Sequence, residues 1–492
     1  MTQTLAFDLG ASSGRALIGK LTRTEAGEHK LEVEEIHRFP NVPVQVGRHL
    51  HWDILRLLQE MKHALRKAFQ LGYHPVSFGV DTWGVDFGLL DANGELLGNP
   101  YHYRDPHTEG LIEELEARFG REELFRQGGL QFMPFNTVYQ LYAMKKAASP
   151  KLDTARTLLL TPDLLVYLLT GQRICEFSMA TTTQLLHPES RQWNKALMEQ
   201  LGIPEDLFLD PVYPGTRIGP LSEEVREELG IPSVEAVAVA THDTESAVAA
   251  IPASAGPFAY LVCGTWSLVG TELDQPLLTE EAMKLEFSNE GGVGGKYQLL
   301  KNIMGLWILQ ECKREWDEQG RVYSFAELAS MAEQEEAFRF LINPDDLRFF
   351  GPSNMPEKVR SYCHETGQPV PATEAEVARC IMDSLALRYR SALEQIEQLL
   401  GVRYSGMHMV GGGIQNKLLC RLTANAIGRP VWAGPVEASA IGNMLAQFMA
   451  LGECADLEEA RQLSAASFPV DSYEPADMDV WNEAYERFKQ MK

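Results

Sequence analysis

The sequence has 492 residues, of which 45% are hydrophobic and 23% are charged, and its formal net charge is −24. This length predicts two or three domains, and the acidic charge argues against a nucleic-acid partner, which requires a basic face. No apolar run reaches about 18 residues, so no transmembrane helix is expected, and the N-terminus lacks the basic segment of a signal peptide. Seven cysteines without close spacing fit a reducing cytoplasm, and a disulfide between Cys363 and Cys380 stays open.

The first distinctive feature is a strand–turn–strand pattern near the start of the chain. Residues 4–10 and 15–21 have the composition of strands, and the turn between them reads Gly-Ala-Ser-Ser-Gly. A P-loop or a Rossmann turn opens a helix after its glycines, whereas here a second strand follows. Such a hairpin can still direct backbone N–H groups and hydroxyls at a phosphate, and Asp8 at the strand end could hold a hydrated Mg²⁺. The alternative is an ordinary tight turn.

A polar and aromatic corner follows the amphipathic helix that we predict over residues 54–71. Residues 76–90 read as two strands, with Trp83 and Gly84 between them. An indole beside a glycine offers a flat wall and a close backbone approach, which suits a small sugar, and Trp83 or Phe87 could face its apolar part. The alternative is that Trp83 is buried for packing, as most aromatic side chains are.

We expect the chain to be organised around residues 235–251. A short buried strand, residues 236–240, turns sharply into a small-residue helix that begins near Glu245, and the turn contains Thr241, His242, Asp243 and Thr244. Open α/β sheets place their chemistry where a core strand ends beside a helix start, which makes Asp243 the candidate functional carboxylate. The alternative is that Asp243 or Thr241 merely caps the helix.

The second half of the chain repeats the architecture of the first. Residues 252–257 are rich in turn formers and predict a domain boundary, and residues 258–271 again read as strand, glycine and hydroxyl turn, strand. A long helix over residues 374–400 precedes a strand over 406–410, and three glycines then lead into a helix over 415–427. Glycines at such a junction let the backbone approach a flat ligand, but a tight packing turn would explain them equally well.

Together these segments resemble the FGGY carbohydrate kinases of the actin and hexokinase superfamily. The general features are residues 8–13 (Asp-Leu-Gly-Ala-Ser-Ser) and 410–416 (Val-Gly-Gly-Gly-Ile-Gln-Asn). The more specific runs are residues 80–87 (Val-Asp-Thr-Trp-Gly-Val-Asp-Phe), 240–247 (Ala-Thr-His-Asp-Thr-Glu-Ser-Ala) and 263–268 (Cys-Gly-Thr-Trp-Ser-Leu). The resemblance covers nearly the whole chain, from Asp8 to about residue 452.

The fold that this resemblance implies is α/β, with two actin-like, ribonuclease H-like ATPase domains around a central cleft. Each domain is a mixed sheet flanked by helices. We place an N-terminal sugar-kinase domain at residues 1–251, a C-terminal nucleotide domain at 252–455 and a peripheral helical tail at 456–492.

The resemblance also implies ligands and residue roles. ATP is the phosphate donor, Mg²⁺ is the metal and a small-molecule ketose is the acceptor, and we expect a cytoplasmic monomer without nucleic-acid or membrane partners. The residues expected to contact the sugar are Gly84, His242, Asp243, Thr244 and Asn302. The residues expected to contact ATP are Ala11, Ser12, Ser13, Gly14, Arg15, Thr265, Gln310 and Gly412, with Asp8 at the metal.

Asp243 is the general base in the mechanism that the resemblance implies. Its carboxylate would accept the proton of the sugar O1 hydroxyl during attack on the γ-phosphorus. Because the alcohol loses its proton late, an ordinary carboxyl pKa of about 4 would suffice. Closure of the domains on the sugar would exclude water. Three alternatives stay open: a kinase for another ketose, an ATPase or chaperone of the superfamily, and a non-catalytic sugar sensor.

Overall fold

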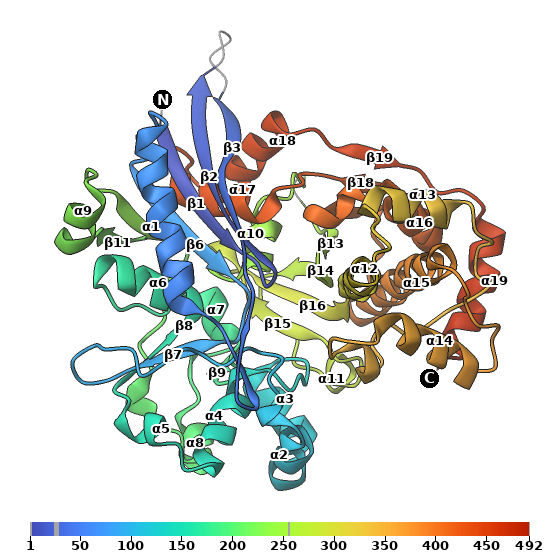
Figure 1. Ribbon diagram of the computed structural model, residues 1–492, viewed down its shortest axis with the longest axis horizontal. Coiled ribbons are helices and arrows are strands. Elements are labelled where there is room, and N and C mark those ends of the chain that lie inside the picture. The colour runs from blue at the N-terminus through green and yellow to red at the C-terminus, as the bar shows by residue number, and fades with distance from the viewer. Residues whose placement is uncertain (1, 24–28, 254–255, 492) are drawn as a thin grey trace. The chain divides into compact units, whose positions relative to one another are not determined.

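The computed structural model describes residues 2–23, 29–253 and 256–491 (Figure 1). The chain forms two compact units, and neither is one continuous stretch. Unit 1 comprises Met1–Ala255, Leu273–Leu299 and Ala438–Ser467, and unit 2 comprises Gly256–Glu272, Leu300–Glu437 and Phe468–Lys492. The chain first leaves unit 1 in the segment where the sequence predicts a boundary, and residues 254 and 255 of that segment lie outside the described residues.

The sheet of unit 1 has the order β11-β12-β6-β1-β2-β3. These strands span Thr2–Leu9 (β1), Ser13–Arg23 (β2), His29–Pro40 (β3), Ser77–Thr82 (β6), Thr216–Pro220 (β11) and Glu235–Ala238 (β12). Strands β1, β2 and β3 are joined antiparallel, whereas β1 pairs with β6 and β6 with β12 in parallel. The carboxyl ends of these three parallel strands therefore lie at one edge of the sheet, which is where ligands bind in open α/β sheets.

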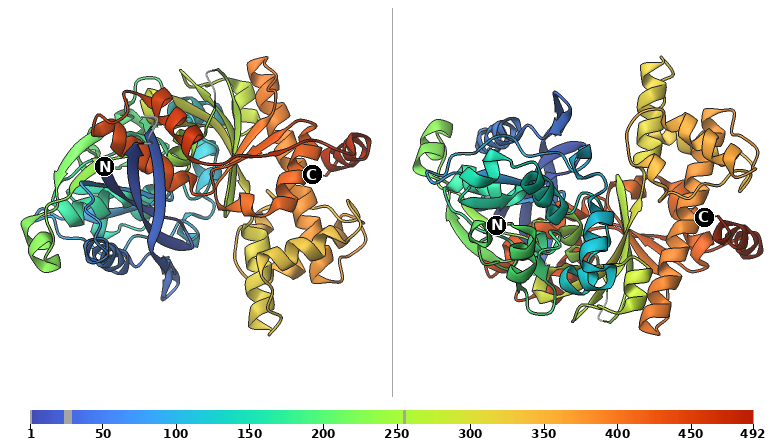
Figure 2. Two further views of the ribbon diagram at one scale, coloured as in Figure 1. Left: turned by 90° about the horizontal axis from the view of Figure 1, so that it is seen from above. Right: turned by 90° about the horizontal axis from the view of Figure 1, so that it is seen from below.

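Helices cover both faces of this sheet. The helix α1 (Ile54–Gln70) packs on β2 and β3, and α17 (Ala438–Ala450) packs on β1 and β6 together with α10 (Asp243–Ala249). The left panel of Figure 2 shows α1 and α17 on opposite sides of the blue strands. Two buried amides of α17 bind the sheet, because Asn443 Nδ2 donates to Asp81 Oδ2 at 2.6 Å and Gln447 Nε2 donates to the Leu5 carbonyl at 3.0 Å.

The remaining part of unit 1 is mostly helical and carries several short strands. Its helices are α2 (Leu111–Phe119), α3 (Arg121–Gly128), α4 (Thr137–Lys146), α5 (Pro150–Thr154), α6 (Thr161–Thr170), α7 (Phe177–Thr181), α8 (Lys195–Leu201), α9 (Glu223–Leu229), α11 (Glu280–Lys284) and α18 (Leu457–Ser467). Its strands are β4 (Val44–Val46), β5 (His49–His51), β7 (Phe87–Leu90), β8 (Thr157–Leu160), β9 (Leu186–His187), β10 (Gln192–Trp193) and β15 (Ser288–Gly291).

The sheet of unit 2 repeats this strand pattern, which confirms the predicted repeat. From β16 onward its order is β16-β14-β13-β17-β18-β19. The strands span Tyr297–Met304 (β16), Trp266–Leu273 (β14), Ala259–Cys263 (β13), Met407–Val410 (β17), Val431–Ala433 (β18) and Asp471–Tyr473 (β19). The hairpin β13-β14 is antiparallel, β13-β17 and β17-β18 are parallel, and β18-β19 is antiparallel. The tail predicted to be helical thus contributes a strand, β19, to this sheet.

The helices of unit 2 are α12 (Trp307–Glu318), α13 (Phe325–Glu333), α14 (Met355–Glu365), α15 (Glu374–Leu400), α16 (Lys417–Ile427) and α19 (Met478–Lys489). The central helix α15 begins with a capping box, in which Thr373 and Glu376 bind each other's backbone, and ends at the left-handed Gly401. Among the described residues, no helix is long and apolar enough to cross a membrane.

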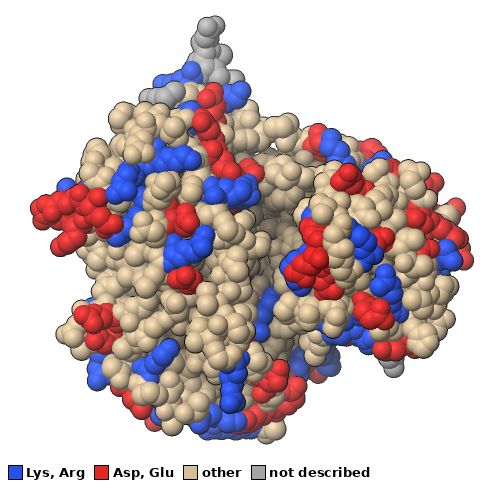
Figure 3. All heavy atoms as spheres, viewed as in Figure 1, with Lys and Arg blue, Asp and Glu red and all other residues tan. Residues whose placement is uncertain are grey.

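The surface carries charges of both signs. On the face in Figure 3, lysines and arginines alternate in small groups with aspartates and glutamates. An acidic group at the left of that view coincides with α9, whose first turn contains Glu223 and Glu224. Mixed charge of this kind is ordinary for a surface in contact with water.

Candidate active site

The turn between β12 and α10 leaves the carboxylate of Asp243 available for chemistry. Helix α10 begins at Asp243, and His242 at its N-cap makes no side-chain capping hydrogen bond. The hydroxyl of Thr241 does not cap the helix either, because it donates to Glu176 Oε2 at 2.7 Å. Neither Thr241 nor Asp243 is the N-cap residue, and the carboxylate of Asp243, which accepts from the Thr244 hydroxyl at 3.4 Å, is 28% exposed at the edge of the sheet.

A buried acid that the sequence did not reveal holds this turn in place. Glu176 accepts hydrogen bonds from the backbone N–H of Thr241 at 3.1 Å and from its hydroxyl. Ser178 Oγ accepts from the His242 N–H at 3.3 Å, and the Thr82 N–H at the end of β6 donates to the Thr241 carbonyl at 2.8 Å. The turn is thus fixed from two sides, since α7 and β6 both bind its backbone.

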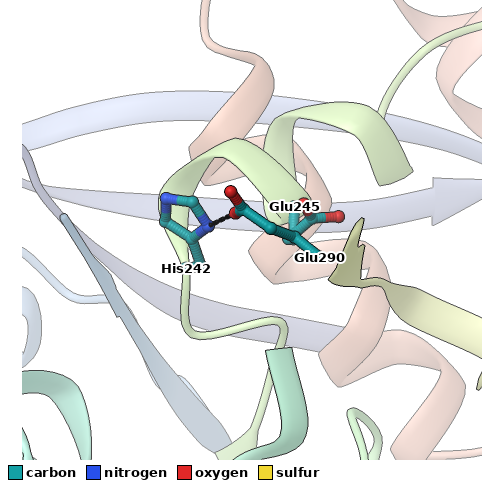
Figure 4. A group of neighbouring side chains, drawn as sticks. All are labelled: His242, Glu245 and Glu290. Carbon is teal, nitrogen blue, oxygen red and sulfur yellow. Dashed lines mark ion pairs between the residues drawn. The ribbon is translucent and has the colours of Figure 1, made fainter. Parts of the chain in front are cut away.

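His242 connects Asp243 to a second buried acid, Glu290 of β15. Its Nδ1 lies 3.0 Å from Glu290 Oε2 (Figure 4), and its Nε2 lies 3.7 Å from Asp243 Oδ1. Burial lowers the pKa of His242, but the contact with Glu290 and the negative charges of Glu290, Asp243 and Glu176 together leave that pKa raised. The imidazole is therefore biased toward its protonated form.

The surroundings also perturb Asp243 itself. Burial and, to a smaller extent, the negative charge of Asp8 raise its pKa, the charge of His242 lowers it, and the result is a pKa of about 6. This differs from the ordinary value of about 4 that the sequence argument assumed. A carboxylate with this pKa is a stronger base than a free aspartate and is still mostly ionised at neutral pH.

Three of the other predicted sugar contacts also gather here. A Cβ placed on Gly84 would lie 3.5 Å from His242 Nε2 and 3.4 Å from the methyl group of Thr182. Gly84 therefore lies against the imidazole, and Thr244 follows Asp243 directly in α10. The fifth predicted contact, Asn302, lies in β16 within unit 2.

The aromatic corner beside Gly84 is a packed core, so the packing alternative for Trp83 is correct. Trp83 is 5% exposed and stacks on Trp52 with ring centroids 3.8 Å apart. Both indoles donate to Asp86 Oδ2, at 2.9 Å and 2.6 Å. Phe87 is only 6% exposed, so neither candidate for the apolar wall presents a broad face to solvent.

The first hairpin turn has the predicted glycine and hydroxyl tip. The Gly10 N–H donates to the Ser13 carbonyl at 3.0 Å, and Asn41 binds the turn twice, through its side chain to the Gly10 carbonyl and through its backbone to Ser12. Packing leaves no room for a side chain at Gly14, because a Cβ there would lie 2.2 Å from the ring of Phe39. Ser12 is exposed at the tip of the turn, and Ala11 and Ser13 on either side of it are half-buried.

Carboxylates around Asp8 provide a donor set that fits Mg²⁺. Asp8 and Asp81 are register partners on the parallel strands β1 and β6, and Asp8 raises the pKa of both Asp81 and Asp243, after the larger effect of burial. Arg15 pairs with Asp8. Asp81 Oδ1 is buried and has no hydrogen-bond partner in the described part of the chain. Carboxylate oxygens of this kind are the ligands that Mg²⁺ takes.

The predicted nucleotide residues of unit 2 lie at the corresponding strand ends. Thr265 is in the β13-β14 turn, and its hydroxyl donates to Gln310 Oε1 at 3.2 Å. Gly412 has open space where a Cβ would be, whereas Cβ atoms on Gly411 and Gly413 would lie 2.9 Å and 2.3 Å from Cys263. Two of the three glycines are thus explained by packing, and the middle one leaves room for a ligand.

Comparison with known proteins places the chain in a class that this geometry already suggests. The N-terminal domain of the FGGY family of carbohydrate kinases matches residues 3–250, and the C-terminal domain of the same family matches residues 259–451. The chain belongs to the FGGY family of carbohydrate kinases, which confirms the resemblance deduced from its motifs.

Rhamnulokinases of two bacteria are among the relatives that are similar to this chain over nearly their full length. The chain is 45% identical to a rhamnulokinase of Bacteroides thetaiotaomicron, over 98% of each chain. It is 44% identical to a rhamnulokinase of Pectobacterium carotovorum, over 96% of this chain and 92% of that one.

Solved structures share the fold at much lower identity. A ligand-bound xylulose kinase of Lactobacillus acidophilus has a TM-score of 0.80 at 15% identity, with 100% of this chain and 97% of that chain covered. Plasmodium falciparum glycerol kinase with ADP has a TM-score of 0.74 at 14% identity, with 99% and 98% covered. These structures confirm the α/β fold class with mixed sheets flanked by helices.

Proposed function

We propose that this enzyme transfers the γ-phosphoryl group of ATP to O1 of L-rhamnulose, giving L-rhamnulose 1-phosphate and ADP in L-rhamnose catabolism. The observation that carries the proposal is the position of the Asp243 carboxylate. It lies beside His242 and Gly84, where the parallel strands of the unit 1 sheet end. Rhamnulokinase relatives that match nearly the full length support this choice of sugar. We further propose that the enzyme acts as a monomer in the cytoplasm.

Asp243 is the general base of this reaction. Phosphoryl transfer is mostly positioning and neutralisation of charge, and a carboxylate orients the attacking hydroxyl and accepts its proton. With a pKa of about 6, Asp243 is ionised at neutral pH and can take that proton as the new O–P bond forms. Gly84 allows the sugar to approach the backbone closely, and His242 and Thr244 complete its polar contacts.

Phosphate binding falls to the two glycine and hydroxyl turns, through the backbone and hydroxyls of residues 11–15 and through Thr265. Gln310 and Gly412 contact the rest of the nucleotide. Asp8 and Asp81 would hold the magnesium ion, which when bound neutralises charge on the phosphate oxygens. Arg15 pairs with Asp8 and offsets the charge of that carboxylate when the metal is absent.

The test is release of ADP from Mg·ATP against a panel of L-rhamnulose, L-fuculose, D-xylulose, L-xylulose, L-ribulose and glycerol. We expect a rate on L-rhamnulose well above the others. A higher rate on another ketose would replace the proposed substrate. Sugar-independent ATP hydrolysis would favour an ATPase, and sugar binding without a phosphorylated product would favour a sensor.

The role of Asp243 is tested separately with Asp243→Asn. This variant should retain sugar binding by calorimetry and lose about 10²- to 10⁴-fold in kcat, the usual contribution of a general base. Asp91→Asn, in the turn after β7, is the matched control and should leave kcat unchanged. A tenth or more of the wild-type kcat in Asp243→Asn would refute the role.

A further inference from the structure

Glu290 is a buried acid to which neither the family motifs nor the proposed mechanism gives a role. It lies in β15, 5% exposed, and is separated from the His242 turn by more than forty positions in the sequence. Its carboxylate meets the imidazole of His242 edge on (Figure 4). Burying a charged carboxylate is expensive unless it is paired, so the ion pair with His242 offsets the cost of burying Glu290.

The contact determines which edge of His242 faces the substrate. Glu290 Oε2 forms an ion pair with Nδ1 at 3.0 Å, and a carboxylate at this distance favours a hydrogen on that nitrogen. Nε2 is then left on the side of Asp243 Oδ1, at 3.7 Å, and of Gly84. Asp243, the predicted base, and Gly84, a predicted sugar contact, thus both lie next to Nε2, whereas Nδ1 on the other side of the ring contacts Glu290.

We propose that Glu290 is a positioning residue that acts through His242. It fixes the orientation of the imidazole and favours the imidazolium, so that Nε2 presents a hydrogen to the sugar and its positive charge keeps Asp243 ionised. This inference rests on the proposed function, since it assigns Glu290 a task in the same sugar site.

Three further acidic residues lie near His242: Asp243, Glu176 and Glu245. Asp243 lies on the Nε2 side, and Glu176 lies beneath the turn and raises the pKa of His242 more weakly than Glu290 and Asp243 do. Glu245 of α10 lies within 4.8 Å of the ligand atoms of His242 and Glu290, a spacing that could also hold a metal ion. In the structure the imidazole and the Glu290 carboxylate meet directly, which requires no metal between them.

The primary test is Glu290→Gln in the full-length enzyme. The amide keeps the size and shape of the side chain but has no charge to stabilise a positive imidazole. We expect kcat to fall about 10- to 100-fold, the loss that is typical when the hydrogen-bond partner of a metal-binding histidine is removed. The KM for ATP should be unchanged. The ascending limb of the pH profile should move to higher pH, because Asp243 loses the cation that keeps it ionised.

Glu245→Gln is the matched control, since it neutralises an equally buried acid beside the same imidazole. We expect its pH profile to stay at the wild-type position. An equal displacement in both variants, or none in Glu290→Gln, would overturn the inference. In a His242→Gln background, Glu290→Gln should add no further loss of kcat, and an additive loss would also overturn it.

Two measurements remain informative even if the sugar is wrong. Nitrogen-15 NMR of labelled histidine should show His242 with a hydrogen on Nδ1 and a raised pKa that falls in Glu290→Gln, whether or not the panel reveals an acceptor. Elemental analysis of the purified protein should find no stoichiometric transition metal. A bound metal that is lost in Glu290→Gln would show that these groups are ligands and would overturn the direct contact.

Discussion

Asp86→Asn tests how the aromatic corner beside Gly84 is held together. The carboxylate of Asp86 is buried and accepts hydrogen bonds from Trp52 and Trp83 through their indoles, from Gln140 Nε2 at 2.8 Å and from the Tyr103 N–H at 3.1 Å. Burial nevertheless raises its pKa from 3.8 to about 7, against the effect of these donors. The folded protein therefore prefers the protonated acid in the pH range where an unfolded chain has already released the proton.

The sign of the pH dependence follows from this difference. The contribution of Asp86 to stability is complete below pH 3.8, falls as pH rises and is lost by pH 7. Each pH unit within that window costs about 1.4 kcal/mol, which amounts to about 2–3 kcal/mol between pH 5 and pH 8. Asparagine does not titrate, so the wild type should lose this much relative to Asp86→Asn over the same interval.

At pH 5 the variant should be less stable by about 1–3 kcal/mol, because its amide N–H₂ would face the N–H₂ of Gln140. Urea unfolding followed by tryptophan fluorescence measures both effects, since Trp52 and Trp83 border the site. Asp91→Asn is the control, because the pKa of Asp91 is lowered from 3.8 and neither of its states titrates between pH 5 and pH 8. A stability gap between wild type and Asp86→Asn that stays constant across this range would refute the reasoning.

Two further predictions follow from the packing and from the base. Gly442→Ala should destabilise the protein by about 3 kcal/mol or more, because its Cβ would lie 1.7 Å from the Ser246 carbonyl oxygen where α17 crosses α10. Thermal unfolding measures this loss. Gly351→Ala is the control, because a Cβ there meets nothing within 4 Å. The kcat/KM for the sugar should rise with pH about a midpoint near pH 6, because Asp243 must be ionised to act, and a profile that is flat between pH 5 and pH 7 would contradict its role.

The local elements were predictable because their signals are local. The range predicted for the long helix, 374–400, matches α15, since a capping box and a C-terminal glycine mark its ends. The end of β12 and the start of α10 were each displaced by two residues, because the strand pairing ends at Ala238 and the helix extends back to Asp243. Such boundaries depend on which backbone groups find partners, and those partners come from other parts of the chain.

The supporting residues of the site could not be predicted in this way. Glu176 and Glu290 have no motif around them, and each reaches the His242 turn only because α7 and β15 fold against it. Asn41 likewise binds a turn that lies about thirty positions earlier. A buried acid in a single sequence looks like any surface acid until the fold shows what surrounds it, so the candidate base was visible in the sequence and its environment was not.

The shared strand pattern of the two units allows the acids of unit 1 to be compared with the matching positions of unit 2. In unit 1, Asp8 precedes the last paired residue of β1 and is the register partner of Asp81 on β6. The corresponding position in the β13-β14 hairpin is Val262, whose register partner on β17 is Val410. The same two positions at the same edge thus hold a pair of carboxylates in one sheet and a pair of aliphatic side chains in the other.

This replacement divides the chemistry between two copies of one scaffold. Carboxylates beside one another suit a cation and a base, and they repel phosphate unless a metal or an arginine neutralises them. Valines at the equivalent edge of unit 2 carry no such charge, so the turn with Thr265 and the open position at Gly412 present only hydroxyl and backbone groups to a polyanion. In a chain with a net charge of −24, the proposed nucleotide contacts Thr265 and Gly412 therefore lie at a strand edge that has valines where the unit 1 sheet has Asp8 and Asp81.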